Sequence, residues 1–184
     1  MARAILESCA RCHGTDGLVR GVGAFPKLAR QNFEYLSFSL HAYRLGERHS
    51  GVMGPIAAAL SDSDLDAVSR YYADLPLPSP SPSPKSSEVQ RGELIARQGI
   101  PSHRVPPCAE CNGPAESRRN PAYPKIAGQY AKYLKLQLEL FKKRARVGTA
   151  YSHLMTGDAA NLTPEQINDA ALYYASLPDN GLSR

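Results

Sequence analysis

The sequence contains an internal repeat that spans about half of the chain, and this repeat limits the folds that the chain can adopt. Three blocks recur in the same order, at offsets of 98 residues for the first two and 102 for the third. They are PKLARQ at 26–31 and PKIAGQ at 124–129, Tyr-Leu at 35–36 and 133–134, and YYADLP at 71–76 and YYASLP at 173–178. A repeat on this scale predicts two tandem copies of one domain.

Proline and serine alternate between the two copies, in the stretch that begins PLPSPSPSPK. Alternating prolines remove backbone donors and favour an extended, semi-rigid polyproline II path. We therefore predict a first domain over residues 1–76, a linker over 77–88 and a second domain over 89–184. Because each half has fewer than one hundred residues, a large cofactor would help to complete its hydrophobic core.

The pattern within each copy is helical. No segment shows sustained two-residue alternation, and several place apolar residues three or four positions apart. The last helix of the second copy has a clear start, with Thr163 as N-cap, Pro164 in the first turn and Gln166 completing a capping box. Ser61 stands in the equivalent place of the first copy. We predict an all-α fold in which an N-terminal helix runs into each cysteine motif.

Cys9, Cys12 and His13 form a Cys-x-x-Cys-His motif. Two thiols about one helical turn apart can reach both vinyl groups of haem, while the adjacent imidazole is directed at the iron. The alternatives are a redox dithiol, a disulfide or half of a zinc site, but zinc needs more ligands and a thioredoxin-like fold needs strands. The motif therefore predicts haem c attached at Cys9 and Cys12, with His13 as an axial iron ligand.

A sixth iron ligand is expected from methionine. Apart from Met1, the chain contains only Met53 and Met155, each placed between its cysteine motif and the last helix of its copy. Methionine is more often core filler, but this scarcity and matched placement favour thioether ligation, which raises the potential of a haem. We predict Met53 as the second axial ligand of the first haem and Met155 as its counterpart in the second copy.

The second cysteine motif departs from the first. Cys108 and Cys111 are followed by Asn112, whose neutral amide is a poor iron ligand compared with imidazole. Three interpretations stay open: a haem that lacks its usual proximal ligand and recruits His103 or His153, an empty site whose cysteines form a disulfide, or a histidine replaced deliberately or by a sequence error.

The overall charge is mildly basic, with 22 Lys and Arg against 17 Asp and Glu and a net charge of +5. This balance is too small to indicate nucleic-acid binding. His41 and His49 lie in polar or basic contexts typical of solvated side chains. A basic cluster is interpreted either as solvated helix faces or as a steering surface for an acidic redox partner. Its members are Lys142, Lys143, Arg144 and Arg146, with Arg44 and Arg48 at comparable places in the first copy.

Together these motifs make the chain resemble the dihaem class I cytochromes c, specifically the cytochrome c-four type, over nearly its whole length. The resemblance implies two tandem class I cytochrome c domains, with haem on Cys9 and Cys12 and with His13 and Met53 on its iron. It also places Cys108, Cys111 and Met155 at the equivalent second site, from which Asn112 departs.

The resemblance further implies a periplasmic electron carrier rather than an enzyme, often serving a terminal oxidase. No apolar stretch is long enough to span a membrane, and no signal peptide is visible although attached haem requires export. One alternative is a cytochrome subunit of an oxidoreductase complex. Another is catalysis or ligand sensing at an incompletely ligated second haem.

Overall fold

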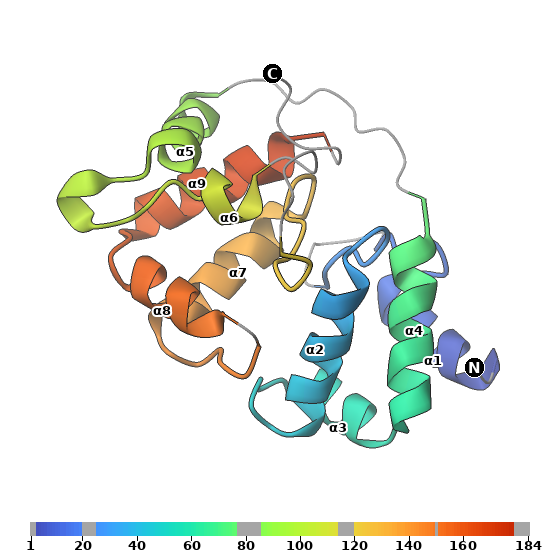
Figure 1. Ribbon diagram of the computed structural model, residues 1–184. Helices are drawn as coiled ribbons and strands as arrows, with labels where there is room; N and C mark the ends of the chain where they lie inside the picture. Colours follow the sequence, from blue (N-terminus) through green and yellow to red (C-terminus); the bar gives the residue numbers. More distant parts are fainter. Residues whose placement is uncertain (1–2, 20–24, 77–85, 114–119, 150, 179–184) are drawn as a thin grey trace.

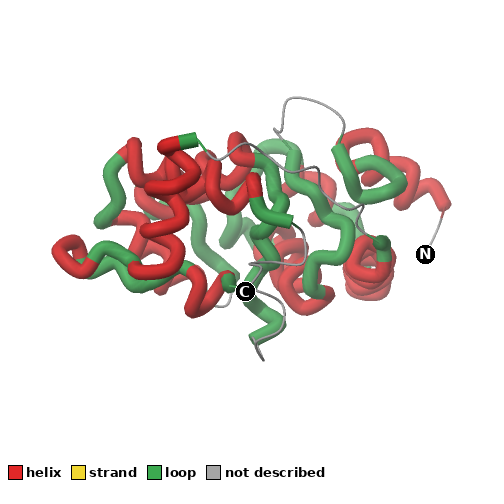
Figure 2. The backbone as a smooth tube through the Cα atoms, turned by 90° about the horizontal axis from the view of Figure 1, so that it is seen from above, coloured by secondary structure: helices red, strands yellow, loops and turns green. Residues whose placement is uncertain are grey.

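The computed structural model of the chain describes residues 3–19, 25–76, 86–113, 120–149 and 151–178. Within these ranges the regular structure is helical, and the β contacts are two isolated bridges. Figure 2 accordingly shows helices and loops without a strand. The helices of the first copy are α1 (Arg3–His13), α2 (Phe33–Arg44), α3 (Met53–Ala58) and α4 (Asp62–Asp74). Those of the second copy are α5 (Ser87–Gln98), the 3-10 turn η1 (Pro101–His103), α6 (Ala109–Asn112), α7 (Ala131–Lys142), α8 (Ser152–Ala160) and α9 (Pro164–Ser176).

The two copies form two halves that lie side by side. Helices α1 to α4, in blue to green, occupy one side of Figure 1, and α5 to α9, in yellow-green to red, occupy the other. The all-α tandem fold predicted from the repeat is therefore confirmed. Most of the predicted linker lies outside the described residues, so its bounds stay a prediction. Helix α5 begins at Ser87, which is within the last two residues of the predicted linker.

Equivalent side chains build the core of each half. Leu36 and Tyr72 pack together in the first copy, and Leu134 and Tyr174 occupy the same places in the second. The predicted capping box is confirmed, because the Thr163 hydroxyl accepts from the Gln166 backbone N–H at 3.2 Å and the Gln166 side chain accepts from the Thr163 N–H at 2.8 Å. Ser61 caps α4 through one bond of this kind, since its hydroxyl accepts from the Asp64 backbone N–H at 3.2 Å.

The prediction of a helix running into each cysteine motif is right for one copy and wrong for the other. Helix α1 contains the whole motif and ends at His13. In the second copy α5 ends at Gln98, because Gly99 turns the chain with φ of 67° and the 3-10 turn follows at once. An antiparallel bridge between Ile100 and Val105 closes that excursion, and the motif then lies in the short helix α6.

The α5 and α9 helices cross at very short range through Gly92. A Cβ atom at this position would lie 2.1 Å from the backbone oxygen of Asp169. Beside the crossing, the Arg91 guanidinium pairs with the buried Asp169 carboxylate at 2.6 Å. Because the α9 backbone is the obstacle, a side chain at position 92 must push the helices apart.

We expect Gly92→Ala to lower the free energy of unfolding by about 1–3 kcal/mol, which is the usual cost of overpacking. The matched control is Gly157→Ala in α8, where a new Cβ meets nothing within 4 Å. Since alanine is the better helix former, that variant should gain about 0.5–1 kcal/mol. Urea unfolding followed by circular dichroism measures both changes, and equal stability of the two variants would contradict the close crossing.

Candidate functional site

The two halves meet through the repeated glutamines. The Gln31 side chain accepts from the Lys125 backbone N–H at 2.8 Å and donates to the Lys125 carbonyl at 2.8 Å. The Gln129 side chain makes the same pair of hydrogen bonds with Lys27, at 2.9 and 3.0 Å. Each copy thus offers the same groups to the other, as in the isologous interface of a two-fold dimer.

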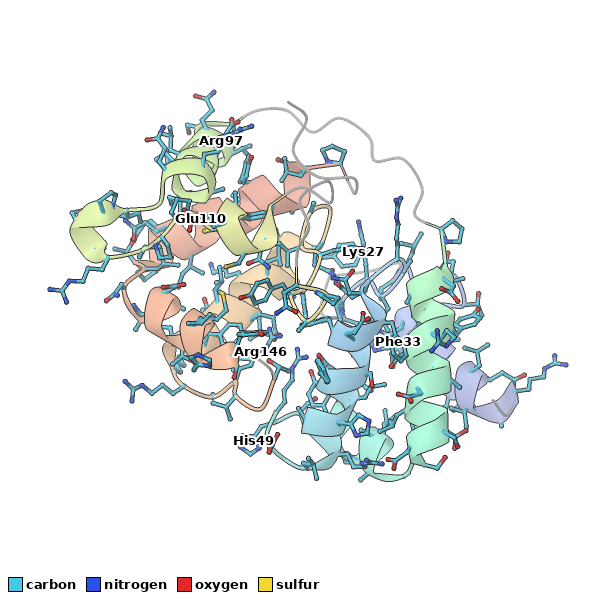
Figure 3. The ribbon with its side chains drawn as sticks, viewed as in Figure 1. Lys27, Phe33, His49, Arg97, Glu110 and Arg146 are labelled. Carbon is cyan, nitrogen blue, oxygen red and sulfur yellow. The ribbon has the colours of Figure 1, made fainter. Side chains whose placement is uncertain are left out.

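Arg48 and Arg146 continue this reciprocity deeper in the interface. Their backbones form an antiparallel bridge, and each side chain is only 5% exposed. Arg48 donates to the Tyr133 hydroxyl at 3.1 Å, and Arg146 donates to the Tyr35 hydroxyl at 2.7 Å. Both guanidinium groups also donate to the Gln137 side chain. Figure 3 shows Arg146 between the two halves.

This arrangement corrects the interpretation of the basic cluster. Arg48 and Arg146 are neither solvated nor part of a steering surface, because the association of the two copies buries them. Arg44 is held by Asp62 at 2.6 Å, and the Lys142 ammonium donates to two carbonyl groups at the end of α8. Lys142, Lys143 and Arg144 are all exposed on the second copy, and within the described residues only Lys142 of these three forms side-chain hydrogen bonds.

A cavity of about 520 Å³ lies between the helices and is bounded by both copies. Its lining is mostly apolar. The cavity brings together nearly all of the site residues predicted from the sequence, although Cys12 lies on α1 outside the lining. Those that line it are Cys9, His13, Met53, Cys108, Cys111, Asn112 and Met155.

His13 is held as a neutral imidazole that faces the cavity. Its ring is buried, and Nδ1 lies 3.2 Å from the Pro26 carbonyl oxygen, so Nδ1 carries the proton and Nε2 keeps its lone pair. Burial lowers the pKa of His13, and the hydrogen bond to Pro26 offsets that effect only in part. A neutral imidazole oriented through its other nitrogen is the usual form of a metal-ligating histidine.

Asn112 occupies the position of His13 in the second copy and keeps its hydrogen bond. The Asn112 side-chain amide donates to the Pro124 carbonyl at 3.2 Å, and Pro124 is the repeat counterpart of Pro26. The framework that orients the proximal side chain is therefore retained, while the imidazole nitrogen is lost.

The four cysteines are free thiols. Burial raises the pKa of Cys9, and it raises the pKa of Cys108 to about 11. A redox-active dithiol needs a lowered thiol pKa, so Cys9 and Cys108 suit covalent attachment of a group better than disulfide exchange.

The two histidines considered for the second site do not reach the cavity. His103 and His153 are exposed and do not line it. His49, labelled in Figure 3, is exposed but does line the cavity, in the first copy, and His41 contacts the Arg44 guanidinium at 2.9 Å. Recruitment of His103 or His153 by a second haem has no support in this geometry.

Two cavity residues were missed by the sequence reasoning. Tyr123 stands at the repeat position of Phe25, and its hydroxyl lies close enough to the Cys111 thiol to help raise the pKa of Tyr123, for which burial is the main cause. Asp158 stands at the position of Ile56 and lines the cavity, and burial raises the pKa of its carboxyl group. A comparison of the two copies residue by residue, rather than block by block, would have identified both differences.

The cavity fits a large apolar group that carries two carboxylates, as haem does. Arg48 and Arg146 line it, and within the described residues neither forms an ion pair with an acidic side chain. The buried Nε of Arg146 has no hydrogen-bond partner there. Burial alone raises the pKa of Tyr35, yet Arg146 and Arg48 outweigh it and lower that pKa to about 8. The positive charges of Arg48 and Arg146 are therefore available to pair with the propionate groups of haem.

A helical domain whose apolar cavity receives a neutral imidazole from a Cys-x-x-Cys-His helix is the architecture of a c-type cytochrome, and the chain carries this domain twice. The cytochrome c family model matches residues 2–75. The thiosulfate dehydrogenase electron acceptor of Stutzerimonas stutzeri is 32% identical over 92% of this chain and 79% of its own length.

Two solved structures are similar over the whole fold. Cytochrome c4 of Acidithiobacillus ferrooxidans is 31% identical, with a TM-score of 0.81 over 93% of this chain and 99% of the other. Thiosulfate dehydrogenase TsdBA of Marichromatium purpuratum is 32% identical with a TM-score of 0.80, and the match covers 92% of this chain but 36% of that one. The chain belongs to the cytochrome c family, within the dihaem cytochrome c4 group.

Membership confirms the electron-carrier class and the haem c cofactor expected from the motifs. Haem supplies the one-electron chemistry, and the protein residues orient it, exclude water and set its potential. Among the described residues, no helix has the length and apolar character that a membrane crossing requires.

We expect Arg48→Gln to lower the free energy of unfolding of the haem-loaded protein by about 1–3 kcal/mol, because it leaves buried partners unpaired. Removing a positive charge beside the cavity should also lower the midpoint potential. Arg44→Gln is the control, since its ion pair with the exposed Asp62 is worth about 0–1 kcal/mol. Thermal unfolding and a redox titration measure the two effects, and matching losses in both variants would contradict the buried role of Arg48.

Proposed function

We propose that this chain is a periplasmic electron carrier whose working redox centre is a haem held by Cys9 and Cys12, with His13 and Met53 as axial ligands. The observation that carries the proposal is the cavity that receives the neutral His13 ring and the Met53 side chain together. Export to the periplasm follows from the need to attach haem outside the cytoplasm, as in the relatives of the cytochrome c4 group.

The residues around this cavity would serve one-electron transfer without binding a substrate. The Pro26 carbonyl fixes the His13 ring, so the ligand does not reorient when the charge of the iron changes. The Met53 thioether favours the reduced state and raises the potential. The Tyr72 ring packs against the His13 ring edge to face, with the two ring centroids 6.4 Å apart.

A reduced-minus-oxidised spectrum tests the proposal, and we expect c-type absorption bands in protein from a haem-competent host. Met53→Ala should abolish the weak sulfur-to-iron charge-transfer band and lower the midpoint potential of the first haem, because the thioether ligand is lost. Met155→Ala is the matched control and should leave that band in place. Loss of the band in Met155→Ala but not in Met53→Ala would reverse the assignment.

We further propose that the electron donor is a dehydrogenase of the thiosulfate dehydrogenase class. Two relatives are named as electron acceptors of that enzyme, and the TsdBA structure contains a segment similar to this chain. This favours the alternative in which the cytochrome works as a partner or subunit of an oxidoreductase. Reduction of the cytochrome by such a dehydrogenase and thiosulfate is the assay, and absence of reduction would favour another donor.

Lys143 and Arg144 form the remaining exposed basic pair for docking an acidic partner surface. We expect Lys143→Glu to slow reduction by the donor roughly three- to tenfold at low salt, and the difference should shrink as salt screens the charges. Arg97→Glu is the control, because Arg97 lies on α5 at the far edge of the second half (Figure 3). Equal effects of both variants would show that only net charge matters.

A further inference from the structure

The part of the cavity that the second copy lines, here called the second pocket, differs from the first pocket at several positions. Three residues that line the first pocket have polar counterparts without an imidazole in the second. His13 is replaced by Asn112, Phe25 by Tyr123 and Ile56 by Asp158. The residues beside these positions keep their roles. The Pro124 carbonyl accepts a hydrogen bond from Asn112, and Ala159 is as fully buried as its counterpart Ala57.

The Asn112 side of this pocket has polar groups and no imidazole. The amide nitrogen of Asn112 is engaged by the Pro124 carbonyl, which leaves its oxygen as an acceptor for a molecule in the cavity. Tyr123, which contacts the Cys111 thiol, adds a hydroxyl donor where the first copy presents the apolar ring of Phe25 against His13 at 6.0 Å.

No histidine of the second copy can take the place of the missing ligand. His103 lies on the exposed 3-10 turn and His153 on the exposed face of α8, and neither lines the cavity. Met155 does line the cavity and is the single ligand that the sequence repeat supplies there. A haem attached at this site would therefore have one protein ligand on its iron and one free position.

We propose that the second copy is a binding site for a small uncharged iron ligand, which enters on the side of Asn112 and Tyr123. The inference rests on the proposed haem chemistry extending to Cys108 and Cys111. An anionic ligand is disfavoured, because the haem propionates would take up the positive charges of Arg48 and Arg146 while Asp158 adds a carboxyl group to the lining. Carbon monoxide and imidazole are suitable probes, the first for ferrous and the second for ferric iron.

Intact mass of the haem-loaded full chain comes first, and we expect two attached haems. Carbon monoxide added to the reduced protein should then change the spectrum of one haem of the two, and imidazole should convert the same haem in the oxidised protein. Asn112→His fills the free position and should weaken carbon monoxide binding at least tenfold. Asn112→Gln keeps an amide without a ligand nitrogen and should still bind. Tyr123→Phe should alter the affinity without abolishing binding.

The outcomes separate this inference from the function proposed above. A mass with one haem, carried at Cys9 and Cys12, overturns the ligand site and leaves the electron carrier intact, whereas a mass with none overturns both. Two haems with no spectral response to either probe also overturn the site. Undiminished carbon monoxide binding in Asn112→His would place the free position on the Met155 side and contradict the proposal.

Discussion

The reciprocal hydrogen bonding of Gln31 and Gln129 is the interaction on which the rest of the structure depends. Each glutamine side chain hydrogen-bonds a backbone N–H and a backbone carbonyl of the other copy. The repeated block that contains the glutamine therefore belongs both to its own domain and to the interface between the domains. This association buries Arg48 and Arg146 and closes one cavity across both copies. Two small domains with modest hydrophobic cores thereby enclose a cavity that neither domain could enclose alone.

Because the two copies have the same backbone arrangement around each pocket, the pockets can differ in chemistry without differing in position. The carbonyl groups of Pro26 and Pro124 hold an imidazole in one copy and an amide in the other, at the same distance of 3.2 Å. The first pocket brings together a histidine and a methionine, a ligand pair that suits electron transfer. The second has Asn112, Tyr123 and Asp158 in place of His13, Phe25 and Ile56, which is the basis of the proposed ligand site.

Much of this was predictable from the sequence because repeats and short motifs carry local information. The helical class, the capping box at Thr163 and the placement of Met53 with His13 follow from spacing alone. The burial of Arg48 and Arg146 was not predictable, since it depends on how the copies associate and charge patterns describe single helices. The early end of α5 was not predicted, because both copies were expected to have the same helix before the cysteine motif. Gly99 followed by Pro101 is a sequence signal for a helix end at that point.

The central claim is that both copies hold haem in one cavity but only the first provides iron with two protein ligands. Diffraction at the iron absorption edge from crystals of the haem-loaded protein tests it most directly. The account predicts two iron positions, one bonded to His13 and Met53 and the other to Met155 with no protein nitrogen. A single iron position, or a second iron bonded to a histidine of this chain, would contradict it.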